Sequence, residues 1–170
     1  MRVGKKIAAV LLSMTMLSGA VGCSTADSGT STVQSQESKQ WISKQTAVRQ
    51  QSITQWKKTA ADKTRTSSER ALASFAVNAL SNDMKPLIEA NDVDRQALLR
   101  SLASQKPPSA PTGLPALSSL TIESVNQLDQ GKTMYTIRGT IFTSVPDKLY
   151  PITLQIRMNK SGQLEFSTVG

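Results

Sequence analysis

The spacing of the hydrophobic residues changes once along the chain, near residue 115. Before that point they recur every three to four residues, which is the spacing of one face of an α-helix. Thr66 and Glu69 have the spacing of a capping box and mark the start of the clearest helix. The expected helical segments are 39–65, 66–80, 84–90 and 92–103.

After residue 115 apolar and polar residues alternate, as they do along a half-buried β-strand. The alternation is clearest over 152–158 and 135–141, with shorter strands expected near Leu120 and Leu164. Four consecutive strands with short links predict an antiparallel meander with one apolar face. We therefore expect an α+β fold, in which N-terminal helices pack on a C-terminal four-stranded antiparallel meander.

The first 22 residues have the order of a secretory signal peptide. Positive residues precede an apolar run from Ile7 to Leu17, and small residues follow the run. The 15 residues from Ile7 to Val21 are fewer than the roughly 20 that a membrane-spanning helix needs. This pattern predicts export of the chain and removal of residues 1–22.

The small residues lead directly into Cys23, the one cysteine of the chain. Ala20-Val21-Gly22-Cys23 resembles the lipobox of bacterial lipoproteins, although such boxes usually carry Leu at the first position. The resemblance implies cleavage between Gly22 and Cys23 and acylation of Cys23. Membrane lipid would then be a partner, with the mature domain outside the cytoplasm on the cell membrane or the outer membrane. The alternative is an ordinary signal peptide that leaves a free Cys23.

Two segments have compositions typical of connections. Residues 23–38 are rich in Ser, Thr, Gln and Gly, and we expect a flexible tether. Residues 106–115 contain four of the seven prolines, and we expect an extended loop. The expected organisation is a signal peptide at 1–22, a tether at 23–38, a basic amphipathic helix at 39–65 and an α+β domain at 66–170.

The net charge of +8 is unevenly distributed. Three positive charges lie in the signal peptide, and residues 39–70 carry eight basic residues against Asp62 and Glu69. Both tryptophans fall on the apolar face of this basic segment, where they either pack against the domain or contact a membrane or a partner. The residues considered for such contact are Trp41, Trp56, Lys57 and Lys58. Nucleic acid is not expected as a partner, because an exported protein rarely meets it.

The composition argues against an enzyme. The chain contains no histidine, which excludes His-dependent nucleophile systems and the commonest zinc and iron sites. The remaining acid–base candidates are Asp83, Tyr135 and Tyr150, and Asp83 is better explained as the cap of a turn. Asp92 and Asp94 lack the Gly and distal Glu of a calcium loop and suit a helix start. We expect no catalytic residue, no metal and no cofactor.

Helices followed by a meander resemble the cystatin-like α+β roll, also called the nuclear-transport-factor-two-like fold, over about 66–170. The sequence cue is Phe75-x-x-Asn78-Ala79-Leu80-x-x-Asp83-Met84. This family includes small exported lipoproteins and soluble domains of inner-membrane subunits in type IV secretion and conjugation machines. The resemblance implies a role in assembly or scaffolding.

Two hypotheses follow for the function. The first is a non-enzymatic, membrane-tethered envelope lipoprotein that binds a protein partner, in its most specific form as an accessory to a secretion or conjugation machine. The alternative is a carrier or sensor that binds a small ligand or lipid in the cavity of the roll. The expected pocket residues are Phe75, Tyr135, Ile137, Leu154 and Ile156. The sequence leaves the oligomeric state open.

Overall fold

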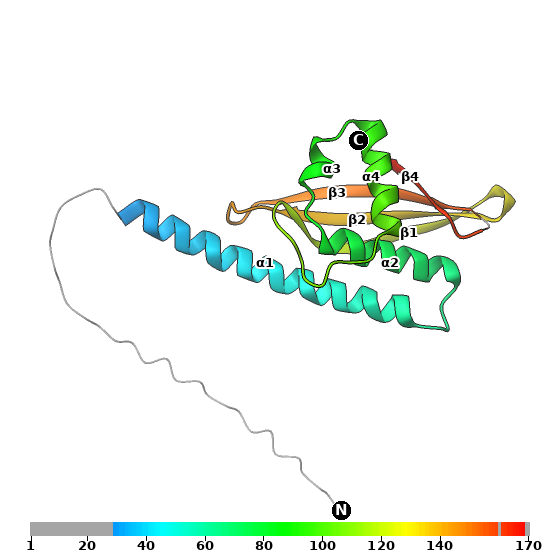
Figure 1. Cartoon of the computed structure of the whole chain (residues 1–170), viewed down its shortest axis with the longest axis horizontal. Helices are drawn as coiled ribbons and strands as arrows, with labels where there is room; N and C mark the ends of the chain where they lie inside the picture. The colour runs from blue at the N-terminus through cyan, green and yellow to red at the C-terminus, as the bar shows by residue number, and fades with distance from the viewer. Residues whose placement is uncertain (1–28, 160, 169–170) are drawn as a thin grey trace, which may run out of the picture.

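The computed structural model describes residues 29–159 and 161–168. In this part of the chain four α-helices precede a four-stranded antiparallel sheet, so the predicted α+β class and order of elements are confirmed (Figure 1). The helices are α1 (Gly29–Ala61), α2 (Ser67–Ser81), α3 (Lys85–Glu89) and α4 (Asp92–Ser104). The strands are β1 (Ala116–Leu128), β2 (Lys132–Phe142), β3 (Leu149–Met158) and β4 (Leu164–Thr168). The predicted signal peptide, Gly22 and Cys23 lie outside the described residues.

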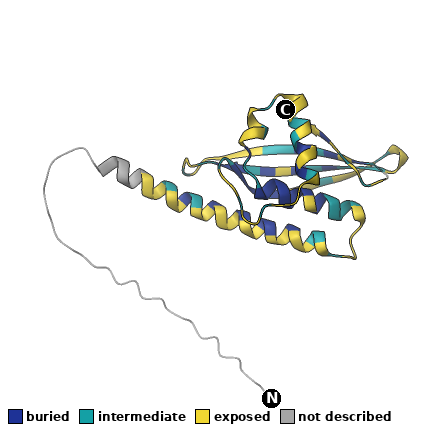
Figure 2. Ribbon diagram, viewed as in Figure 1, coloured by how far each residue is buried: buried dark blue, intermediate teal, exposed yellow. Residues whose placement is uncertain are grey.

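The sheet is a simple meander in the order β1-β2-β3-β4. Paired residues of an antiparallel sheet share a face, and the register places Ile137 opposite Leu154 and Tyr135 opposite Ile156. These side chains form the apolar face, which α2 and α4 cover (Figure 2). The other face carries polar residues such as Arg138 and is more exposed. The period of two in the sequence therefore identified the buried face of the sheet correctly.

Helix α2 lies at the centre of the core. Its first turn is capped, and its apolar face is fully buried. The Glu69 N–H donates to the Thr66 hydroxyl at 3.1 Å, and the Thr66 N–H donates to the Glu69 carboxylate at 2.9 Å. This is the capping box that the sequence predicts. Leu72, Phe75 and Leu80 are completely buried against the sheet and α4.

Helix α1 is longer at its N-terminal end than the sequence predicts. It begins at Gly29 rather than at residue 39, so residues 29–38, expected in the tether, are helical. Packing of the segment from Trp41 to Ala60 nucleates the helix, and each Ser, Thr or Gln then extends it at a cost of only a few tenths of a kcal/mol, about 0.7 at most. The 33 residues of α1 span about 50 Å. Figure 1 shows its first turns extending past the ends of the strands.

The proline-rich segment 106–115 is a loop without regular structure between α4 and β1, as predicted. It is held against the helices by polar contacts. The Thr112 N–H donates to the carbonyl of Ser81 at 3.1 Å, and the Arg49 guanidinium donates to the carbonyl of Thr112 at 3.0 Å. The loop therefore joins the core at the C-terminal end of α2.

Candidate binding groove

The five residues expected to line a pocket belong to the packed core instead. Phe75, Ile137 and Ile156 are completely buried, and the Phe75 ring stacks at a tilt on Phe166 with centroids 4.9 Å apart. Tyr135 and Leu154 are also buried in the same cluster. The small residues of α2, such as Ala73 and Ala76, let the helix approach the sheet closely, so side chains fill this space. The prediction of a pocket inside the roll is wrong for this reason.

An open groove of about 620 Å³ lies beside that core. Its volume falls in the range of about 300–1,000 Å³ that is usual for ligand sites. Of the five residues expected in a pocket, it shares Leu154 alone. The lining comes from the α3 segment, the start of α4 and the ends of β2 and β3. The lining residues are Met84, Leu87, Ile88, Asp92, Arg95, Ile141, Pro151, Ile152, Thr153 and Leu154.

The α3 wall of the groove is fixed where α3 begins. The Met84 N–H donates to the carbonyl of Pro115 at 2.6 Å, and Asp83 forms an isolated antiparallel bridge with Ala116 at the start of β1. The Asp83 carboxylate accepts the Lys85 N–H at 3.2 Å, which supports its interpretation as the cap of a turn. Pro86 suits the start of α3, because the N–H groups in the first turn of a helix have no acceptor within the helix and proline lacks this group.

Arg95 fixes the other end of α3. Its guanidinium donates to the carbonyls of Leu87 at 3.1 Å and Ala90 at 2.7 Å, and it pairs with the Asp92 carboxylate at 2.8 Å. Because Asp92 and Arg95 neutralise each other, the groove has no net charge among its lining residues. Asn91, rather than Asp92, caps α4, and its side chain accepts the N–H of Asp94 at 3.0 Å. The groove is therefore a preformed, neutral and mainly apolar site.

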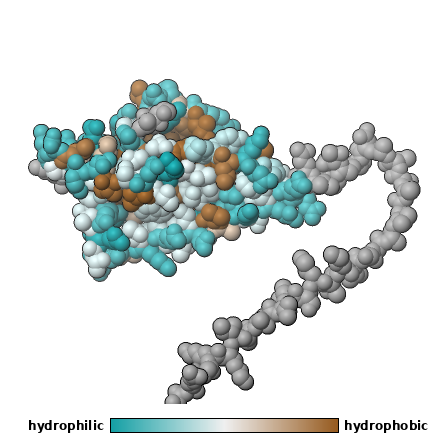
Figure 3. All heavy atoms as spheres, turned by 180° about the vertical axis from the view of Figure 1, so that it is seen from behind, coloured by the Kyte–Doolittle hydropathy of each residue, from teal (hydrophilic) through white to brown (hydrophobic). Residues whose placement is uncertain are grey.

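The β3 wall of the groove is an open sheet edge in the described residues. Strand β4 pairs with β3 only from Leu154 to Met158. The preceding residues, Leu149, Tyr150 and Pro151, are exposed, with Leu149 at 47 %. Across the groove, Ile88 on α3 is 51 % exposed. Pro151 on β3 and Ile88 on α3 thus bring apolar surface to solvent on both sides of the groove. Figure 3, the view from behind Figure 1, shows hydrophobic residues at the surface in separate patches.

The two tryptophans dock α1 on the sheet. Trp56 Nε1–H donates to the carbonyl of Leu120 at 3.0 Å, and Trp41 Nε1–H donates to the carbonyl of Thr143 at 3.2 Å. Both rings are buried. Packing of both rings against the domain is therefore confirmed. It leaves Trp41 and Trp56 little surface for the expected contact with a membrane or a partner, although Trp56 also lines a second, smaller pocket of about 340 Å³.

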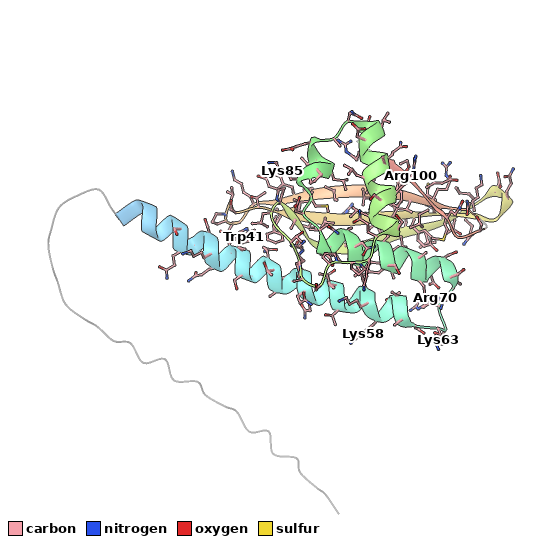
Figure 4. All side chains as sticks on the ribbon, in the orientation of Figure 1. Trp41, Lys58, Lys63, Arg70, Lys85 and Arg100 are labelled. Carbon is pink, nitrogen blue, oxygen red and sulfur yellow. The ribbon has the colours of Figure 1, made fainter. Side chains whose placement is uncertain are left out.

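The lysines of α1 remain exposed. Lys57 and Lys58 lie near the C-terminal end of α1. Figure 4 shows Lys58, Lys63 and Arg70 where α1 passes into α2, far along the helix from Trp41. At 1.5 Å per residue, the 28 positions from Gly29 to Lys57 correspond to about 42 Å along α1. These basic side chains are thus distant from the N-terminal end of α1.

The acid–base candidates do not form one site. On β2 and β3, Tyr135 pairs with Ile156, whereas Tyr150 pairs with Ile141. These pairs are six residues apart along β2, or roughly 20 Å. Burial raises the pKa of Tyr135, with a further contribution from the charge of Glu69, so this phenol stays protonated at neutral pH.

Arg49 is a structural residue that the sequence analysis missed. It is buried on α1 and donates to three backbone carbonyls, those of Leu80, Asn82 and Thr112. Burial lowers the pKa of Arg49 from its usual value, opposed by the charge of Asp83, and the guanidinium remains charged. The sequence did carry a signal for its burial: Arg49 lies eight residues after Trp41 and seven before Trp56, a spacing that places all three on one face of the helix.

Within the described residues, no helix is both long and apolar enough to span a membrane, and no group of three or more His, Cys, Asp or Glu side chains could bind a metal ion. Comparison with known proteins found no matching family model, no matching curated protein and no matching solved structure.

Proposed function

We propose that the chain is a membrane-tethered envelope lipoprotein of non-enzymatic function whose α+β domain binds a protein partner. In this proposal Cys23 carries the lipid and the groove between α3 and β3 receives the partner. A role as an accessory to a secretion or conjugation machine is the most specific form, and it rests on the sequence resemblance alone.

The observation that carries the proposal is the preformed apolar groove. Burying Ile88, which lines the groove and is half exposed, would remove its apolar surface from water at about 25 cal/mol per Å². The bonds of Met84 and Arg95 already hold the α3 wall, so little ordering is needed before a partner binds. Apolar surface that is exposed around a fixed groove is typical of interaction sites.

A small ligand or lipid is the second candidate, because the groove volume also suits a small molecule. The two candidates differ in what touches Ile88. A protein partner would place a polypeptide against this side chain in the cell, whereas a carrier would place a lipid or metabolite there.

Photocrosslinking in intact cells separates these candidates. A photoreactive amino acid would replace Ile88 in the full chain, and the matched control would carry it at Val93, which is 78 % exposed on the neighbouring helix α4. We expect a discrete protein adduct from position 88 that is absent from position 93. Adducts with lipid or metabolite alone would favour the carrier, and equal protein adducts from both positions would contradict a partner site in the groove.

A further inference from the structure

We infer that the groove binds an extended segment of the partner, which pairs as an added strand with residues 149–153 of β3 and places alternate apolar side chains against α3. This inference rests on the proposed function and specifies the chemistry of the partner. It joins two features that lie side by side: an open stretch of sheet edge and an apolar groove next to it.

The open edge is the stretch of β3 that lies beyond its pairing with β4. That pairing ends with Leu154 and Thr168, while β3 continues to Leu149 in full pairing with β2 on its other side. In the described part of the chain, the outward backbone groups of 149–153 therefore lack a strand partner. Such an edge is a template for an extended peptide, whose main chain supplies affinity and whose alternate side chains supply specificity.

The proline in β3 indicates which backbone groups point outward. A proline fits a paired strand where its missing N–H would face away from the neighbouring strand. Since β2 pairs with β3 through this region, Leu149, Pro151 and Thr153 form the outward set. This set offers the N–H groups of Leu149 and Thr153 and the carbonyls of all three residues.

The hydrogen bond of Trp56 identifies the same outward-facing residues of β3. Because Trp56 donates to the carbonyl of Leu120 from α1, that carbonyl points away from β2. Gly139, which pairs with Leu120 on β2, then points its backbone groups toward β3. Its partner Ile152 bonds back to β2, so the flanking residues Pro151 and Thr153 face outward.

The groove selects uncharged side chains at every second position of the added strand. Ile152 and Leu154 project from β3 into the groove, facing Leu87 and Ile88 across it. The one acidic and one basic residue of the lining neutralise each other, so a charged side chain placed there would find no free counter-charge in the lining. A helix would bury apolar area but leave the edge of β3 unpaired. The occupant that satisfies both features is an extended segment with alternating apolar residues.

The test uses the purified chain and a nine-residue peptide in which Ile alternates with Thr between terminal lysines, with Leu and Phe versions of the same design. In a strand, one alternate set of peptide amides faces β3 and the other faces solvent. We expect that N-methylation of the first set lowers affinity at least tenfold and that N-methylation of the second set changes it less than threefold. Affinity unaffected by either modification, or lost equally with both, would overturn the inference.

Two protein variants complete the design. Ile88→Glu places a charge in the groove and should weaken peptide binding at least tenfold, while Val93→Glu on α4 should change it less than twofold. Both residues are exposed, and unchanged urea midpoints would show that both variants are folded. Hydrogen exchange of the Leu149 and Thr153 amides should slow when the unmodified peptide binds, and unchanged exchange at saturation would overturn strand pairing.

The outcomes also separate this inference from the proposed function. Failure of all three peptides to bind, combined with a protein adduct at position 88, would overturn the added strand and leave the protein-binding role standing. Absence of any protein adduct would remove both. Self-association of the chain that Ile88→Glu abolishes would identify a second copy as the occupant and would overturn a foreign strand.

Discussion

Replacement of Arg49 by Met should destabilise the fold strongly, although the other basic residues of α1 are exposed. The side chain is 2 % exposed and joins three parts of the molecule: α1, the C-terminal end of α2 and the proline-rich loop. Met keeps the length and apolar character of the arginine stem but offers no donor. The variant therefore removes the three hydrogen bonds and leaves the packing largely in place.

The expected loss is about 3 kcal/mol of unfolding free energy. The bond to the Leu80 carbonyl is buried, and a buried acceptor left without a donor costs about 1–3 kcal/mol. The carbonyls of Asn82 and Thr112 are partly buried and can regain water, so each lost bond costs roughly 0.5–1.5 kcal/mol. Relief from burying the guanidinium offsets part of this sum. Arg49→Lys should be intermediate, since an ammonium cannot reproduce the planar fork of donors.

Urea unfolding followed by tryptophan fluorescence measures this loss, because Trp41 and Trp56 flank Arg49 on α1 and are buried. With a slope near 2 kcal/mol/M, the midpoint should fall by about 1.5 M without a change in slope. Arg100→Met is the matched control on the exposed face of α4 (Figure 4), and it should shift stability by less than about 0.5 kcal/mol. A loss below about 1 kcal/mol for Arg49→Met would refute the assignment of Arg49 as the link between these elements.

Three further predictions concern the anchor, α1 and pH. Cys23→Ser should release the mature domain from membranes in cell fractionation, and an unchanged membrane fraction would show that another element anchors it. Trp56→Phe should cost about 1 kcal/mol in urea unfolding, because the Leu120 carbonyl loses its donor, whereas an unchanged midpoint would argue against this bond. Hydrogen bonds from the Thr66 backbone and hydroxyl hold the pKa of Glu69 below its usual value. The ionised carboxylate therefore adds stability that is fully present above the ordinary pKa of about 4.5 and is lost as the pH falls through the lower pKa of the folded state. The stability of Glu69→Gln should consequently vary less with acid than that of the wild type, and identical acid profiles would contradict this.

The fold could be predicted largely because its signals are local. The alternation in 135–141 and 152–158 identified both central strands and their buried face, and the capping box located the start of α2. The N-terminal extension of α1 was missed because Ser, Thr and Gln are weak helix formers that also suit a tether. An already nucleated helix passes through such residues at little cost.

The candidate site could not be predicted, because it depends on packing between distant segments. The residues of the sheet face appeared suited to a pocket, but α2 packs on them directly, and the open groove depends on the position of the five-residue helix α3. That position is fixed by the Met84 bond to Pro115 and by the Arg95 bonds, which join residues without any shared pattern in the sequence. Arg49 was missed for the same reason, since its acceptors are backbone carbonyls 31 to 63 residues away.

The most direct measurement of the central claim is amide hydrogen exchange at Leu149 and Thr153 in the chain isolated with its bound partner and without it. The partner adduct formed at position 88 provides the bound sample. Exchange of both amides should slow at least tenfold in the bound chain, while the amide of Val93 on α4 should exchange at the same rate in both samples. Unchanged exchange at Leu149 and Thr153 with the partner attached would contradict binding at the edge of β3.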